Sequence, residues 1–138
     1  MGGKATSVGV FNNLGVALLN LGEKEQARQA FSEAKHRAPT ELDSHKNLAM
    51  LSAQDGDHTA AVDIMNNAVA LQPTNGGAWK LLGQLNAESQ RGLEAQQAYA
   101  RALALDPADA QARSALDQLD ASLGSSASDL PPPAQEAR

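Results

Sequence analysis

Apolar residues recur three and four positions apart along most of this chain, and the whole pattern repeats every 34 residues. The spacing of Phe11, Leu14 and Leu18 is typical of a helix rather than of a strand. Shifting the sequence against itself by 34 positions aligns a set of small and apolar columns. Their members are Leu14, Leu48 and Leu82; Gly15, Ala49 and Gly83; Ala27, Ala61 and Ala95; Ala34, Ala68 and Ala102; and Pro39, Pro73 and Pro107. The pattern predicts three tandem copies of one helical unit.

Glycine and proline divide each copy into two helices. In the first copy we expect a helix over residues 8–21 that breaks at Gly22, and a second over residues 24–37. The second helix ends before Pro39, because proline cannot continue the helical hydrogen bonds. The later copies carry the same punctuation at Gly56 and Pro73 and, with a small shift, at Gly92 and Pro107. The sequence thus predicts six helices of about 14 residues each.

Short polar side chains stand where the next helices begin. Thr40, Asn75 and Asp109 follow the prolines, and Asp57 follows a turn glycine, so we expect their oxygens to cap backbone amides. Helices of this length are marginal alone in water, so their stability must come from packing against neighbours.

The four aromatic residues fall in two columns of the repeat. Phe11 and Trp79 share one column and Phe31 and Tyr99 share the other, while the middle copy has His45 and Met65 there. Side chains in such columns are predicted to pack in the core, between helices that approach closely at the alanine and glycine columns.

The order of these columns resembles the tetratricopeptide repeat. The first copy reads Phe11-Asn12-Asn13-Leu14-Gly15, then Ala27, Phe31, Ala34 and Pro39, and the third reads Trp79-Lys80-Leu81-Leu82-Gly83, then Ala95, Tyr99, Ala102 and Pro107. The middle copy departs at His45, Ala49 and Met65. The resemblance covers about three quarters of the chain. It implies an all-α fold, a right-handed superhelical solenoid of helix-turn-helix units.

The resemblance also divides the chain. The three repeats are expected at residues 8–41, 42–75 and 76–109, followed by a capping helix at residues 110–123 whose apolar face covers the end of the stack. Residues 124–138, with three successive prolines, are expected to be disordered. Residues 1–7 are interpreted as a disordered terminus or a cloning remnant that cannot form a cap helix. The front of the first repeat would then be open, belong to a longer array, or self-associate; we favour the longer array.

Composition narrows the class of protein. The chain has 138 residues and 42% hydrophobic residues, enough for one helical domain. Its net charge of -5 and pI near 5.0 argue against a nucleic-acid partner. No cysteine is present, which excludes disulfide and thiolate chemistry. No apolar run is long enough for membrane insertion and no export signal opens the chain. We expect a soluble, cytoplasmic protein, or a periplasmic one if the sequence is a fragment of an exported protein.

The histidines and acidic residues are the candidates for chemistry in this sequence. His36 lies near a predicted helix end and His45 in a packing column. Asp55, Asp57 and His58 lack the remaining ligands of a calcium loop. No serine has the local sequence of a nucleophile elbow. We therefore expect no enzyme activity, no cofactor and no metal.

Tetratricopeptide arrays present the first helix of each repeat along a concave groove that holds a peptide or partner segment, and the resemblance implies the same here. The groove residues implied are Asn12, Asn13, Val16, Lys46, Asn47, Met50, Lys80 and Gln84. A carboxamide such as Asn13 or Asn47 can pair with both groups of a peptide backbone, although Leu81 interrupts this column. These asparagines are alternatively two solvated polar residues. The two lysines would meet acidic groups, and Met50 would supply adaptable apolar contact.

One family function can be compared residue by residue. Co-chaperones of the clamp type hold a C-terminal carboxylate with lysine, asparagine and arginine side chains at five groove positions. The matching positions here are Asn12, Val16, Asn47, Gly77 and Leu81, of which only Asn47 agrees. The carboxylate clamp is therefore disfavoured.

The leading functional hypothesis is a non-catalytic scaffold that binds a protein or peptide partner in the groove. The alanine-rich repeats resemble bacterial assembly and secretion factors, such as those of pilus biogenesis. The alternative is a regulatory or oligomerisation module of a larger protein that acts through the open face of its first repeat.

Overall fold

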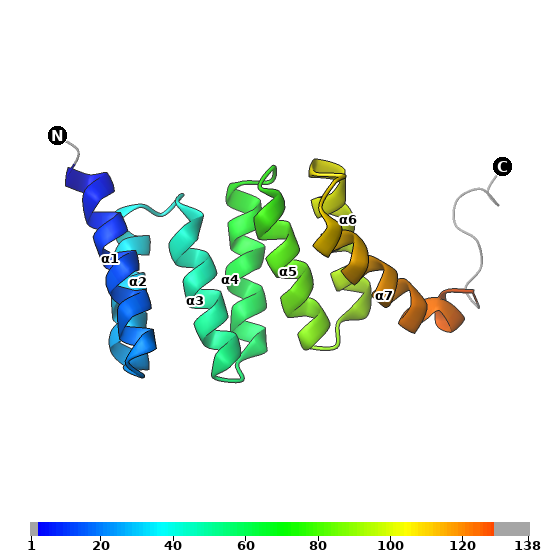
Figure 1. Ribbon diagram of the computed structural model, residues 1–138, viewed down its shortest axis with the longest axis horizontal. Coiled ribbons are helices and arrows are strands. Elements are labelled where there is room, and N and C mark those ends of the chain that lie inside the picture. The colour runs from blue at the N-terminus through cyan, green and yellow to red at the C-terminus, as the bar shows by residue number, and fades with distance from the viewer. Residues whose placement is uncertain (1–2, 129–138) are drawn as a thin grey trace.

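The described part of the chain folds into a single row of stacked helices. A computed structural model describes residues 3–128, which hold seven helices and no strand. In chain order these are α1 (Gly3–Asn20), α2 (Lys24–Arg37), α3 (Leu42–Gln54), α4 (His58–Leu71), α5 (Gly76–Glu88), α6 (Gly92–Leu105) and α7 (Ala110–Ser128). Successive helices run antiparallel and the pairs follow one another in a single row (Figure 1). The all-α repeat stack predicted from the 34-residue period is confirmed.

Both terminal helices are longer than predicted. Helix α1 begins at Gly3, so the prediction that residues 1–7 lie outside a helix is wrong for residues 3–7. Helix α7 continues to Ser128, past the expected end at residue 123. No proline interrupts either extension, and the first proline after α7 is Pro131. Residues 1–2 and 129–138, where the rest of the predicted disorder falls, lie outside the described residues.

The turn inside each repeat contains one residue in the left-handed region. Gly22 (φ 82°) and Gly56 (φ 86°) take this position in the first two repeats, as their sequence suggested. In the third repeat the residue is Gln90 (φ 63°), whereas Gly92 already starts α6, so the predicted shift to Gly92 is wrong. The 34-residue register therefore holds without a shift, although a side chain in this conformation costs roughly 1–2 kcal/mol.

Three of the four predicted caps are present. The side chains of Asp57, Asn75 and Asp109 each accept a hydrogen bond from the backbone N–H three residues later, at 3.0–3.1 Å. The prediction for Thr40 is wrong, because α3 starts one residue later and has no side-chain cap. The Thr40 carbonyl oxygen instead accepts a hydrogen bond from Nε2 of Gln72 at 2.6 Å, which ties the connection between the first two repeats to the residue that follows α4.

One small column and one large column fit each other across the two helices of a repeat. A Cβ on Gly83 would lie 2.9 Å from Cδ2 of Tyr99, and a Cβ on Gly15 would collide with the ring of Phe31. The middle repeat has alanine rather than glycine in the small column, and in it the slender Met65 replaces the ring. Glycine therefore faces an aromatic ring and alanine faces methionine.

The aromatic column formed by Phe11 and Trp79 is less buried than predicted. Phe11 and Trp79 are half-buried, and the guanidinium groups of Arg37 and Arg101 lie over their rings at 4.8 and 5.0 Å from the centroids. In the middle repeat His45 is only 2% exposed. Its Nδ1 lies 3.0 Å from the carbonyl oxygen of Glu41.

The buried His45 predicts a pH-dependent stability. Burial, with a smaller contribution from the charge of Lys35, lowers the pKa of His45 below its ordinary value of 6.5. The unfolded chain then binds this proton more readily, so stability is complete above pH 6.5 and declines as the pH falls from there toward the folded pKa. We expect the melting temperature to drop between pH 7 and pH 5, and part of that drop to vanish in His45→Phe. His36 and His58 are retained in both proteins, so equal pH slopes would contradict the assignment.

The first helices of the repeats form the inner layer of the stack. Helix α3 contacts both α1 and α5 directly, whereas α2, α4 and α6 make no mutual contact of that extent within residues 3–128. Closer approach on one side bends a row of helices toward that side. Helices α1, α3 and α5, which carry the residues predicted to form a groove, therefore lie on the inside of the curve.

Candidate functional site

We use the name groove for the eight predicted residues on α1, α3 and α5. These are Asn12, Asn13, Val16, Lys46, Asn47, Met50, Lys80 and Gln84. Asn12, Lys46, Asn47 and Lys80 are half-buried and the other four are exposed. Val16 and Met50 keep 46% and 49% of their surface in water, which is high for apolar side chains. The groove thus offers both apolar surface and hydrogen-bonding groups.

Asparagines from neighbouring repeats meet in the groove. Nδ2 of Asn47 on α3 donates a hydrogen bond to Oδ1 of Asn12 on α1, at a length of 3.5 Å. That length marks a weak bond, which a ligand can replace at small cost. Asn13 is exposed beside this pair. The sequence analysis gave most weight to Asn13 and Asn47. In the structure Asn47 contacts Asn12, and not Asn13.

The two groove lysines differ in their partners. Nζ of Lys80 lies 2.9 Å from Oδ2 of Asp109 and donates a hydrogen bond to Oε1 of Gln111 at 2.9 Å. The hydrogen bond and charge of Lys80 hold the pKa of the Asp109 carboxyl below its ordinary value. Lys46 forms no ion pair with any residue between 3 and 128, and its Nζ lies beside Gly77. Lys46 is therefore the lysine that can meet a ligand without losing an internal partner.

A pocket of about 260 Å³ opens between α3 and α5. Met50 and Leu81 supply apolar walls, and Gln84 and Glu88 line the pocket from the C-terminal end of α5. Nε2 of Gln84 donates a hydrogen bond to the Glu88 carboxylate at 3.2 Å. Leu81, which interrupts the asparagine column, thus forms an apolar wall of this pocket.

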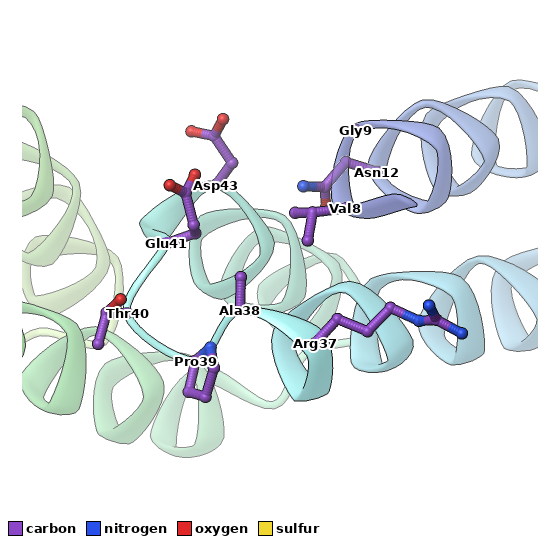
Figure 2. Close-up of a pocket in the computed structure, with 9 residues that line it drawn as sticks. All are labelled: Val8, Gly9, Asn12, Arg37, Ala38, Pro39, Thr40, Glu41 and Asp43. Carbon is purple, nitrogen blue, oxygen red and sulfur yellow. The ribbon is translucent and has the colours of Figure 1, made fainter. Parts of the chain in front are cut away.

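A larger cavity of about 580 Å³ lies at one end of the gap between the first two repeats. Figure 2 shows Val8 and Asn12 of α1 on one side and the carboxylates of Glu41 and Asp43 across from them. The guanidinium group of Arg37 points away from these carboxylates. Column reasoning missed this cavity, because much of its lining comes from the connection at residues 38–41, where the repeat specifies only the proline.

Neither a metal site nor a membrane-spanning helix is found within residues 3–128. In that range no three side chains of the metal-binding types gather in one place. None of the helices there is long and apolar enough to cross a membrane.

Comparisons with known proteins agree with this architecture. Two family models match, both described as tetratricopeptide repeat, at residues 8–40 and 52–119. The chain belongs to the tetratricopeptide repeat family. A search of curated protein sequences gave no match.

Solved structures with the same fold include two tetratricopeptide domains and the protein MamA. The first tetratricopeptide domain of Spaghetti (RPAP3), solved with an HSP90 peptide, is 22% identical with a TM-score of 0.77, over 86% of this chain and 94% of that one. The Sgt2 domain from Aspergillus fumigatus is 19% identical with a TM-score of 0.78, over 92% and 85% of the two chains. The protein MamA is 19% identical with a TM-score of 0.74, over 85% and 68%. Identities this low establish a shared fold.

Proposed function

We propose that this protein is a non-catalytic scaffold that binds an extended segment of another protein in its groove. The observation that carries the proposal is a row of unlike groups on α3. These are Asn47 with its weak hydrogen bond, Lys46, which has no ion pair within residues 3–128, and the pocket at Met50. The Spaghetti domain, which has the same fold, was solved with a bound peptide, and this supports a peptide ligand for the present stack.

The spacing on α3 suggests which segment fits. Lys46 and Met50 are four residues apart, or about 6 Å along a helix that rises 1.5 Å per residue. In an extended chain, side chains on the same face are two residues apart, or about 6.6 Å. A segment with an acidic residue and, two positions away, a large apolar residue would place one beside Lys46 and the other in the Met50 pocket. The asparagines would then bond to its backbone.

The proposed segment is internal to its own chain rather than a C-terminus. Gly77 and Leu81 stand where the clamp co-chaperones carry their basic residues, and Lys80 is already paired with Asp109. A free carboxylate would thus meet only Lys46. Service in a bacterial assembly or secretion system, including pilus biogenesis, stays a prediction from the alanine-rich repeats.

The groove is tested by replacing Asn13 and Asn47 together with alanine. A peptide is first selected against the parent protein from a random display library, and its affinity is then measured by calorimetry for both proteins. Each lost hydrogen bond is worth about 1 kcal/mol, so we expect binding to weaken by roughly ten- to thirtyfold.

The melting temperature of the double variant should stay within a few degrees of the parent, because neither side chain is in the core. A matched control is Asn66 and Asn67 replaced together with alanine on α4, outside the groove. A selected peptide bound equally by all three proteins would refute the groove.

A second candidate function rests on the outer face of the first repeat. Val10, Leu14 and Leu21 are 56%, 45% and 77% exposed, and no described helix packs on that side of α1. This face favours the alternative of a regulatory or oligomerisation module of a larger protein. Self-association would raise the mass in light scattering with concentration, and Val10→Glu should abolish the rise. A constant monomer mass up to millimolar concentration would exclude self-association.

A further inference from the structure

The first repeat lacks a helix that covers each of the later repeats. In front of them, α2 packs on α3 and α4 packs on α5. In the first repeat the equivalent side of α1, with Val10, Leu14 and Leu21, is exposed, and we call it the open face. Leu14 is 45% exposed, whereas its column partners Leu48 and Leu82 are 7% and 4% exposed. The later members of the Val10 column are fully buried.

A cleft beside the open face marks the position of the missing helix. It has a volume of about 530 Å³, and eight residues of α1 and α2 line it. Six of these eight have their column counterparts around a pocket of only about 160 Å³ in the third repeat. There Val62 and Asn66 of α4 complete the lining. The same columns therefore form a filled interface beside α4 and an open cleft in the first repeat.

The charges at the cleft match a helix whose docking side is uncharged. Among the lining residues Glu33 and Arg37 carry charge, and they pair with each other at 2.9 Å. Where α2 packs on α3, Arg28 pairs with Asp55, but the Asp55 column of the first repeat holds Leu21. A basic residue on the docked helix would therefore find no free acid in the lining, whereas an apolar residue would cover Leu21.

Two differences in size along α1 refine the sequence of that helix. Val10 is larger than the buried serine and alanine of its column, and Ala17 is smaller than the buried leucines of its column. Helix α4 runs antiparallel to α5, so its Val62 lies toward the C-terminal end of α5 and its Val69 toward the N-terminal end (Figure 1). A helix docked in the same way on α1 needs a large residue over Ala17 and a small one over Val10.

We propose, building on the second candidate function, that the open face docks an amphipathic helix of a partner protein. Like α2 and α4, this helix has about 14 residues and is about 21 Å long. Its docking side is uncharged, with a large apolar residue near the N-terminus and a small residue seven positions later. It takes the place in front of the first repeat that α2 and α4 take in front of the others.

A second copy of the chain stacked end to end fits the open face less well. The far end of the row is α7 (Figure 1), whose exposed residues include Arg113, Ser114 and Asp117. These polar side chains would have to be buried against Val10 and Leu14, at a cost that an apolar helix avoids.

A peptide copied from α4 is the probe. It spans residues 57–72, carries Val62→Leu and Val69→Ala, and has a hydrocarbon staple between the exposed positions 63 and 67, because so short a helix is marginal alone. Fluorescence anisotropy with the full-length protein should show saturable binding in the micromolar range. The stapled peptide without the two changes should bind about fivefold more weakly, because its sizes do not match α1.

A third peptide tests the charge of the docking side. Val62→Arg, which copies Arg28 of α2, should weaken binding by about tenfold or more, since it removes a buried apolar side chain. Equal binding of this peptide and the first one would overturn the proposal.

Variants of the protein locate the site. Leu14→Glu should weaken binding of the first peptide by about tenfold or more. Val16→Glu is the matched control, because Val16 is 46% exposed on the same helix but belongs to the groove. In case Leu14→Glu folds poorly, Leu21→Lys, at a position 77% exposed, should also weaken binding. Losses as large in Val16→Glu as in Leu14→Glu would overturn the proposal.

The helix and the second candidate function can fail separately. If neither α4-derived peptide binds, the proposal is overturned. A mass that rises with concentration in that case would mean that a second copy covers the open face, which the second candidate function allows. Peptide binding by a protein of constant monomer mass would support the docked helix and exclude oligomerisation.

Discussion

Replacing Phe31 with alanine is expected to lower the free energy of unfolding by about 3–5 kcal/mol. The Phe31 ring is fully buried, lies directly over Gly15, and belongs to the same core cluster as Leu48 and Leu51 of α3. Glycine at position 15 cannot fill the cavity left behind, so little of the loss is recovered by relaxation. Urea denaturation followed by circular dichroism measures the change.

Phe11→Ala is the matched control, with the same chemical change in the same repeat. The Phe11 ring is half-buried under Arg37, so the expected loss is only about 1–2 kcal/mol. Because repeat arrays are stabilised by neighbour contacts, the Phe31 variant should first lose hydrogen-exchange protection in α1 and α2. Similar losses for the two variants would mean that the Phe31 and Phe11 side chains do not differ in burial as described.

Ala61→Trp is expected to cost about 3 kcal/mol or more, at the upper end of what overpacking a core produces. Ala61 is fully buried, on α4 in the middle of the stack, within the largest core cluster. An indole there must push α4 away from α3 and so disturb contacts on both sides of the central repeat. We expect a lower melting temperature and a broader transition, as the outer repeats lose their common neighbour.

Ala70→Trp provides the comparison on the same helix. Ala70 is exposed, so the same substitution should change the free energy of unfolding by about 0.5 kcal/mol or less. If Ala61→Trp melted like Ala70→Trp, the register of the alanine column would be wrong.

The packing of the repeats was predictable because it depends on composition at fixed intervals. Glycine and alanine columns identified close contacts, and the large column identified Phe31, Met65 and Tyr99 as core. Helix ends were less predictable. Gln90 adopts a conformation that favours glycine, since the register set by two other turns outweighs its own preference.

For the proposed groove, the sequence could place candidate residues on α1, α3 and α5, but it could not give their contacts. Family columns located Lys46 and Lys80, but the structure alone shows that Lys80 is engaged by Asp109, which the sequence marked only as a helix cap. Nothing in the sequence indicated that Oδ1 of Asn86, on α5, is buried without a hydrogen-bond partner within the described residues.

The glycine and alanine choices opposite the large column also restrict how such a gene can be recombined. A crossover at the boundary between two repeats would preserve this fit. A crossover inside a repeat could instead join the first helix of the middle repeat, with Ala49, to the second helix of the first repeat, with Phe31. The alanine methyl group would then stand where the ring leaves no room, while the reciprocal product, with Gly15 opposite Met65, would contain a void. In any exchange that involves the middle repeat, its two halves must therefore be inherited together, whereas the first and third repeats, which both pair glycine with an aromatic ring, can exchange halves.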